Sequence, residues 1–187
     1  MKKYFFPAIK LTLLSLILLS GVYTLVLLGI GKLLPGNGEA KKVSYNSKTF
    51  YANIAQNFSE DRYFWSRPSA VDYNAAGSAG SNKGPTNLDY LHTVQARIET
   101  FLAHNPGVGK KNIPVGMVTA SGSGLDPDIS PEAAYVQEKR IASARGIPEQ
   151  EVKSLIEKHI DKPLLGMFGP EKVNVLELNI ALDKLKK

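Results

Sequence analysis

The pattern of apolar and polar positions is dominated by one uninterrupted apolar run near the N-terminus. Residues 11–30 contain no charged side chain, and Lys10 and Lys32 flank them. Twenty helical residues rise about 30 Å, the thickness of the hydrocarbon core of a bilayer. A cleavable signal peptide would have a shorter apolar region and a small-residue cleavage site, and the sequence has neither. The run therefore predicts an uncleaved transmembrane helix over 11–30.

The orientation of this helix does not follow from counting cations, because lysines lie on both sides of it. Residues 1–10 are short and carry three lysines, whereas long domains cross a membrane largely regardless of charge. We therefore expect residues 1–10 to form a cytoplasmic tail and the domain beyond the helix to be extracytoplasmic. Gly21 lies mid-membrane, where a small residue either lets another helix approach closely or is an ordinary membrane glycine.

Beyond the apolar run, a polar segment rich in glycine and proline predicts a linker over 31–42. The remaining residues, 43–187, have the length of one domain with its own core. Several glycines and Pro85 exclude a long regular element before Asn87. The aromatic cluster around Trp65 favours a packed loop there, because large rings are rarely left in water.

Helical spacing of apolar residues predicts an amphipathic helix over 87–104, which ends at an Asn-Pro-Gly sequence. The short apolar and partly β-branched run at 113–119 predicts a strand. This strand would lead into a polar loop that ends near Ser130.

Ser130 is a typical N-cap, and it predicts a helix that Gly146 ends. Another helix is expected from Pro148. Residues 173–187 fit both a strand and a helix, but Asn174 followed three residues later by a glutamate is typical of a helix start. The fold class is therefore α+β: one N-terminal transmembrane helix followed by a single helix-rich α/β extracytoplasmic domain.

Composition narrows the function classes. The net charge of +6 comes from 23 Lys and Arg against 17 Asp and Glu, spread along the chain, so no basic stripe for nucleic acid is present. The absence of cysteine excludes thiolate zinc sites, redox motifs and disulfides. Asp126 and Asp128 flank a proline and favour turn and capping roles; two carboxylates do not form a metal cage, so no metal site is predicted.

Candidate catalytic and phosphate-binding patterns are incomplete. The glycine- and serine-rich loops contain neither a full P-loop nor a dinucleotide fingerprint, which favours structural turns. Ser121 and Ser123 are candidate nucleophiles, but G-x-S-x-G is absent. The three histidines have no acidic residue at a spacing that would indicate a catalytic triad, and they are expected on helix surfaces: His92, His104 and His159.

Two groups of side chains are candidates for contacts. Trp65 and Arg67 either anchor a partner or stack inside the domain, since Trp and Arg concentrate interface energy when they are desolvated. Gln137 and Arg140 share one helix face, for which a solvated surface is the default interpretation.

Six separated blocks of sequence, in order along nearly the whole chain, resemble the KdpC subunits of Kdp potassium-transporting P-type ATPases. The blocks are FWSRPSA (64–70), YN (73–74), GSNKGPTN (80–87), VTASGSGLDPDISPEAA (118–134), ARG (144–146) and VNVLELNIALD (173–183). The resemblance implies a single-pass subunit in a bacterial inner or plasma membrane. It also implies two partner subunits, one channel-like and potassium-translocating and the other an ATP-hydrolysing P-type subunit.

The resemblance implies an accessory role. The chain lacks the D-K-T-G-T phosphorylation signature and any potassium-filter sequence, so we expect no catalytic site of its own. The family is also credited with acting as a catalytic chaperone that raises the partner's affinity for ATP. No stably bound cofactor is expected, and ATP only together with the partner. The nucleotide-associated residues would be Ser121, Gly122, Ser123, Gly124, Leu125 and Gln137.

An extracytoplasmic domain would not meet cytoplasmic ATP, so the residues themselves favour a role in assembly. In that role Gly21 would pack against partner helices and the domain would cap the channel-like subunit. The alternatives are a membrane-anchored extracytoplasmic serine hydrolase using Ser121 or Ser123, and a binding module with Trp65 as its platform.

Overall fold

The computed structural model describes residues 2–34 and 36–185. The chain divides into two compact units, Met1–Lys41 and Lys42–Lys187. The first unit is one helix in three parts: α1 (Lys2–Leu16), a π-helical segment η1 (Ile17–Val22) and α2 (Tyr23–Leu33). Residues Lys3–Leu33 form one helix that is long and apolar enough to cross a membrane. The apolar run 11–30 thus lies inside a longer helix.

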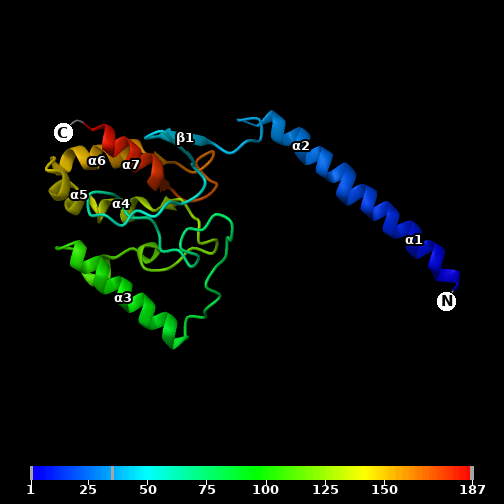
Figure 1. The fold of residues 1–187 in the computed structure, drawn as a ribbon, viewed down its shortest axis with the longest axis horizontal. Coiled ribbons are helices and arrows are strands. Elements are labelled where there is room, and N and C mark those ends of the chain that lie inside the picture. Colours follow the sequence, from blue (N-terminus) through cyan, green and yellow to red (C-terminus); the bar gives the residue numbers. More distant parts are fainter. Residues whose placement is uncertain (1, 35, 186–187) are drawn as a thin grey trace. The chain divides into compact units, whose positions relative to one another are not determined.

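The second unit combines short strands with helices (Figure 1). A hairpin of β1 (Lys42–Tyr45) and β2 (Lys48–Tyr51) comes first; its turn residues Asn46 and Ser47 both have positive φ, as a tight right-twisted hairpin requires. The other elements are α3 (Leu88–His104), the 3₁₀ turns η2 (Lys110–Asn112) and η3 (Val115–Met117), β3 (Asp128–Ile129), α4 (Pro131–Tyr135), α5 (Glu138–Arg145), α6 (Glu149–Lys158), β4 (Ile160–Asp161), β5 (Lys172–Asn174) and α7 (Val175–Lys184).

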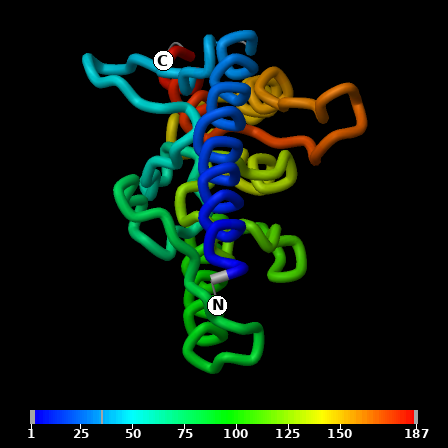
Figure 2. Tube along the Cα trace, turned by 90° about the vertical axis from the view of Figure 1, so that its right-hand side faces the viewer, coloured from blue at the N-terminus to red at the C-terminus, as the bar shows by residue number. Residues whose placement is uncertain are grey.

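The core forms where helices pack on a small antiparallel sheet of order β3-β5-β4. Val173 in the central strand β5 pairs with Ile129 and Ile160 on its two sides and is fully buried. Helices α4 and α7 pack on β5, and α6 packs on α4 and α7. Figure 1 shows α3 on the opposite side of the domain from α6 and α7, with loops between them. In Figure 2 the orange segment between β4 and β5 projects from the body of the domain.

Most predicted helices are confirmed, and the cap predicted at Asn174 is present. The Asn87 side chain accepts a hydrogen bond from the Tyr90 amide at the start of α3, and the Asn174 side chain accepts one from the Glu177 amide at the start of α7. Gly146 adopts the left-handed conformation that ends α5. These ends are local features, and local sequence is sufficient to predict them.

Two predictions are wrong. Residues 113–119 form no strand but the 3₁₀ turn η3, because Pro114 and Gly116 disfavour an extended ladder and the Val118 amide bonds back to the Val115 carbonyl. The helix expected from Ser130 to Gly146 is two helices, α4 and α5. They separate at residues 136–137, where the Gln137 amide bonds only three residues back, to Ala134.

Candidate functional site

Several buried polar side chains hold an irregular segment, residues 58–68, that belongs to no strand or helix. Asn179 of α7 is buried and faces the backbone of Phe64. Its Oδ1 accepts from the Phe64 N–H (2.8 Å), and its Nδ2 donates to the Phe64 carbonyl (2.9 Å). The amide thus replaces a neighbouring strand, which lets the Phe64 ring enter the core without leaving buried backbone groups unpaired.

Gln137 repeats this arrangement one residue further along. Its side chain is fully buried, and Oε1 accepts from the Trp65 N–H (2.8 Å) and from Nη2 of Arg140 (2.6 Å). Its Nε2 donates to the Ala133 carbonyl (2.8 Å) and contacts the Met117 sulfur (3.8 Å). Both acceptor positions and both donor hydrogens of the amide are therefore used inside the domain.

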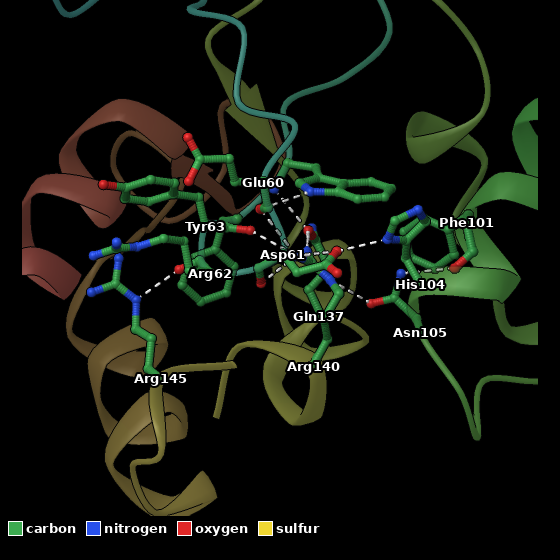
Figure 3. A network of polar contacts seen from close by, with 12 residues as sticks. Glu60, Asp61, Arg62, Tyr63, Phe101, His104, Asn105, Gln137, Arg140 and Arg145 are labelled. Atoms are coloured by element: carbon green, nitrogen blue, oxygen red, sulfur yellow. Dashed lines mark hydrogen bonds and ion pairs between the residues drawn. The ribbon is translucent and has the colours of Figure 1, made fainter. Parts of the chain in front are cut away.

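Arg140 is the centre of the network (Figure 3). Nη1 donates to the carbonyls of Asp61 (2.6 Å) and Tyr63 (3.0 Å), Nε donates to Oδ1 of Asn105 (3.0 Å), and the guanidinium lies 4.6 Å from the Trp65 ring centroid. Burial lowers the pKa of Arg140 to about 10, while the Asp61 carboxylate opposes that shift, so the group stays charged at neutral pH. A solvated face, the default interpretation of Gln137 and Arg140, is wrong for both.

Trp65 stacks inside the domain. Its ring meets Phe101 and His104 edge-on, with centroids 6.2 and 5.1 Å apart, and its Nε1 donates to the Glu60 carbonyl (3.1 Å). His104 Nδ1 lies 2.7 Å from the Asp61 carboxylate. The intradomain interpretation of Trp65 therefore accounts for its contacts. We call the group around it the Arg140 cluster: Asp61, Tyr63, Trp65, His104, Asn105, Gln137 and Arg140.

Arg67 belongs to a different place, a cleft of about 500 Å³ beside the sheet. Its Nη1 pairs with Asp126 at 2.7 Å, while its Nε is buried without a hydrogen-bond partner. Asp126 also accepts from the Asp128 amide, and Asp128 pairs with Lys172 at 2.6 Å. Both carboxylates thus serve turns and ion pairs. Within the described residues, no group of three or more acidic or histidine side chains is placed to hold a metal ion.

The loop 121–125 is packed against residues 69–80. The Ser69 hydroxyl donates to the Gly124 carbonyl (2.7 Å) and the Ser78 hydroxyl to the Ser123 carbonyl (3.0 Å). The hydrogen bonds of Gln137 do not reach this loop. The structure buries Ser121 and Gly124, half-buries Leu125, and exposes Gly122 and Ser123.

The nucleotide-associated set is therefore not one constellation, and its role stays a prediction. The same holds for a partner contact at Gly21, where an added methyl group would have no described atom within 4 Å.

The sequence interpretation missed several residues that hold the domain together. Asp183 accepts hydrogen bonds from the hydroxyls of Tyr45 and Tyr63 and pairs with Arg145 at 2.6 Å. The sequence did contain a signal for Asn179: it is a polar amide among the apolar positions of the C-terminal helix, and a buried amide needs a hydrogen-bond partner. Phe64, the partner of Asn179, and the two tyrosine partners of Asp183 lie more than a hundred positions away, so only the fold reveals these contacts.

These features define a class of protein: one helix fit to cross a membrane, followed by an α+β domain whose buried polar side chains bind its own loops. The family model of KdpC, described as "K+-transporting ATPase, c chain", matches residues 5–184. The chain is 56% identical over 185 residues to the potassium-transporting ATPase KdpC subunit of Flavobacterium johnsoniae, covering 98% of this chain and 100% of that protein. It is 52% identical to the KdpC subunit of Bacteroides fragilis, covering 98% of each chain.

The protein of the same name from Caldanaerobacter subterraneus is 45% identical, with 96% of this chain and 94% of that protein covered. The chain belongs to the KdpC family.

Proposed function

We propose that this chain is the accessory subunit of a potassium-transporting P-type ATPase of the bacterial cell membrane. The observation that carries the proposal is the family match over residues 5–184, which includes both the apolar helix and the domain. The partners would be a channel-like potassium-translocating subunit and an ATP-hydrolysing subunit. The helix Lys3–Leu33 would anchor the chain beside them.

Within the complex, the chain would assist assembly with its domain on the extracytoplasmic side and its N-terminus in the cytoplasm. The Arg140 cluster supports this over a chemical role, because its polar atoms bind the chain's own backbone. A rigid domain presents a preorganised surface, which lowers the entropy lost when subunits associate.

The role of catalytic chaperone for ATP is the weaker proposal. It would need Gln137 beside nucleotide, but that side chain is fully buried and its hydrogen-bonding positions are occupied. The serine hydrolase is weaker still. Ser121 is buried, and the hydrogen-bonding ring nitrogens of His104 and His159 face Asp61 and the Leu155 carbonyl rather than a serine.

Co-purification and growth test the accessory role. A tagged full-length chain is expected to bring down both partner subunits from detergent-solubilised membranes. Deletion of its gene is expected to abolish growth at limiting potassium in a strain without other potassium uptake systems. Ser123→Ala should restore growth as well as the wild type, since an assembly role does not use this exposed hydroxyl. Loss of growth with that variant would instead support the nucleotide or hydrolase role.

A cysteine label tests the placement of the domain. The chain has no cysteine, so Lys110→Cys, at an exposed position, gives a single thiol. An impermeant maleimide should label this variant in intact cells, whereas the control Lys3→Cys should react only after the cells are opened. The reverse pattern would put the domain in the cytoplasm and make the ATP role the leading one.

A further inference from the structure

The connection between β4 and β5 carries a concentration of exposed apolar side chains. Of the eight large apolar side chains exposed in the described part of the second unit, four lie within residues 164–168. Leu164, Leu165, Met167 and Phe168 are 60–78% exposed. Figure 2 shows this orange segment standing out from the domain. We call residues 163–169 the apolar hairpin.

The apolar hairpin is ordered by its own backbone. The amide of Leu164 donates to the Phe168 carbonyl (3.1 Å), and the amide of Phe168 donates to the Leu164 carbonyl (3.0 Å). The Gly166 amide donates to the Pro163 carbonyl (2.9 Å) and the Met167 amide to the Leu164 carbonyl (3.2 Å). Because these four amides are paired internally, moving the tip into an apolar environment costs less than it would for an unpaired backbone.

The turn of the apolar hairpin also contains a strained backbone conformation. Leu165 has φ +55°, a left-handed conformation that a leucine rarely adopts, and it is followed by Gly166 at φ +72°. A strained backbone that presents four exposed apolar side chains adds nothing to the stability of the isolated domain. Such a patch is typical of a binding surface, and methionine and phenylalanine are enriched at the centres of interfaces.

The charges around the apolar hairpin favour a protein over a lipid bilayer as its binding partner. A loop that inserts into a bilayer usually carries a cationic rim for anionic headgroups. Here Lys162 is adjacent to Asp161, Lys172 is adjacent to Glu171, and the Lys172 ammonium is already held by Asp128. The rim is therefore close to neutral, and electrostatics offers little attraction to anionic lipid.

We propose that the apolar hairpin inserts into an apolar groove on another subunit of the potassium-transporting ATPase. This proposal rests on the proposed function, because it requires the chain to assemble with those subunits. The hairpin supplies apolar side chains from a preformed turn, which lowers the conformational entropy lost on binding.

Photo-cross-linking in the assembled complex tests the occupant directly. A photoreactive phenylalanine analogue in place of Phe168 is incorporated into the full chain, co-expressed with the partner subunits in their native membrane. Irradiation is expected to join it to a partner polypeptide. The matched control is the same analogue at Tyr51, an exposed aromatic residue of the β-hairpin, which should give no such product at comparable yield. A lipid adduct, or no adduct, at position 168 would overturn the proposal.

Substitution then measures the contribution to assembly. The double variant Leu165→Ser, Phe168→Ser is expected to reduce recovery of the partner subunits about tenfold or more. The control Leu88→Ser, Leu91→Ser, which also removes two exposed leucines, should stay within about twofold of the wild type. Unchanged recovery with the hairpin variant would refute the inference and leave the proposed function intact. Failure of the wild-type chain itself to recover partners would instead refute the proposed function.

Discussion

Arg140→Met tests the interpretation that the Arg140 cluster holds the irregular segment 58–68 in place. Methionine retains an unbranched apolar stem like that of arginine but lacks the guanidinium donors. The substitution removes the guanidinium hydrogen bonds to the carbonyls of Asp61 and Tyr63 and to the side-chain oxygens of Asn105 and Gln137.

The magnitude follows from the hydrogen bonds that the substitution removes and from the charge of their donor. Hydrogen bonds from a charged donor contribute about 1.5–3 kcal/mol each, but those of one side chain are not additive. An acceptor left without its donor inside the domain costs about 1–3 kcal/mol, and four acceptors that share one donor are not fully additive, so we expect a loss of roughly 3–5 kcal/mol in the free energy of unfolding. For a domain of this length each kcal/mol lowers Tm by about 2–4 °C, which gives a decrease of roughly 6–20 °C.

The assay is thermal and urea unfolding of the full chain in detergent, followed by tryptophan fluorescence. Trp65 is the only tryptophan in the chain, and it lies against the Arg140 guanidinium, so the signal reports on the cluster itself. Lys139→Met is the matched control, because it removes an exposed cation one residue away. If both variants unfold within about 0.5 kcal/mol of the wild type, the Arg140 cluster does not stabilise the domain and our reasoning is wrong.

Two further predictions concern the packed loop and the pH dependence of stability. Gly124→Ala should destabilise the domain by about 1–3 kcal/mol, because φ is +68° and the new methyl would lie 2.7 Å from Val71 Cγ2; in the same urea titration Gly122→Ala, with no atom within 4 Å, should be nearly neutral. Burial alone would raise the pKa of Asp183, but hydrogen bonds from two tyrosines and Arg145 bring it below its ordinary value. Its contribution is therefore fully present above about pH 4 and is lost as the pH falls through the folded-state pKa. Acid titrations followed by fluorescence should show a weaker loss of stability for Asp183→Asn than for the wild type; an equal acid response would contradict this assignment.

The helices could be predicted from the sequence because their signals are local. Asn87 and Asn174 stand directly before periodic apolar positions, and each caps the helix that follows. The strand predicted over 113–119 failed because a short apolar run is compatible with several structures until its neighbours are known. Leu88 and Leu91 show the same limit, since they fit the apolar spacing of α3 and yet lie exposed.

The candidate residues show where local reasoning ends. Gln137 and Arg140 could be placed on one helix face from their spacing, but whether that face meets solvent depends on residues 60–65, more than seventy positions earlier. For the same reason, the sequence could not decide whether Trp65 anchors a partner or stacks inside the domain.

The sequence by itself determined that the chain has one helix fit to cross a membrane, that its domain is α+β, and which family it belongs to, because apolar runs, caps and ordered motifs are properties of neighbouring residues. Only the tertiary structure decided what the polar residues do. In the folded domain, Asn179, Gln137 and Arg140 form hydrogen bonds with the backbone of a loop. The apolar hairpin exposes its apolar side chains. The physical reason is that burial and hydrogen-bond partners are set by segments distant in the chain, which meet only when the core forms.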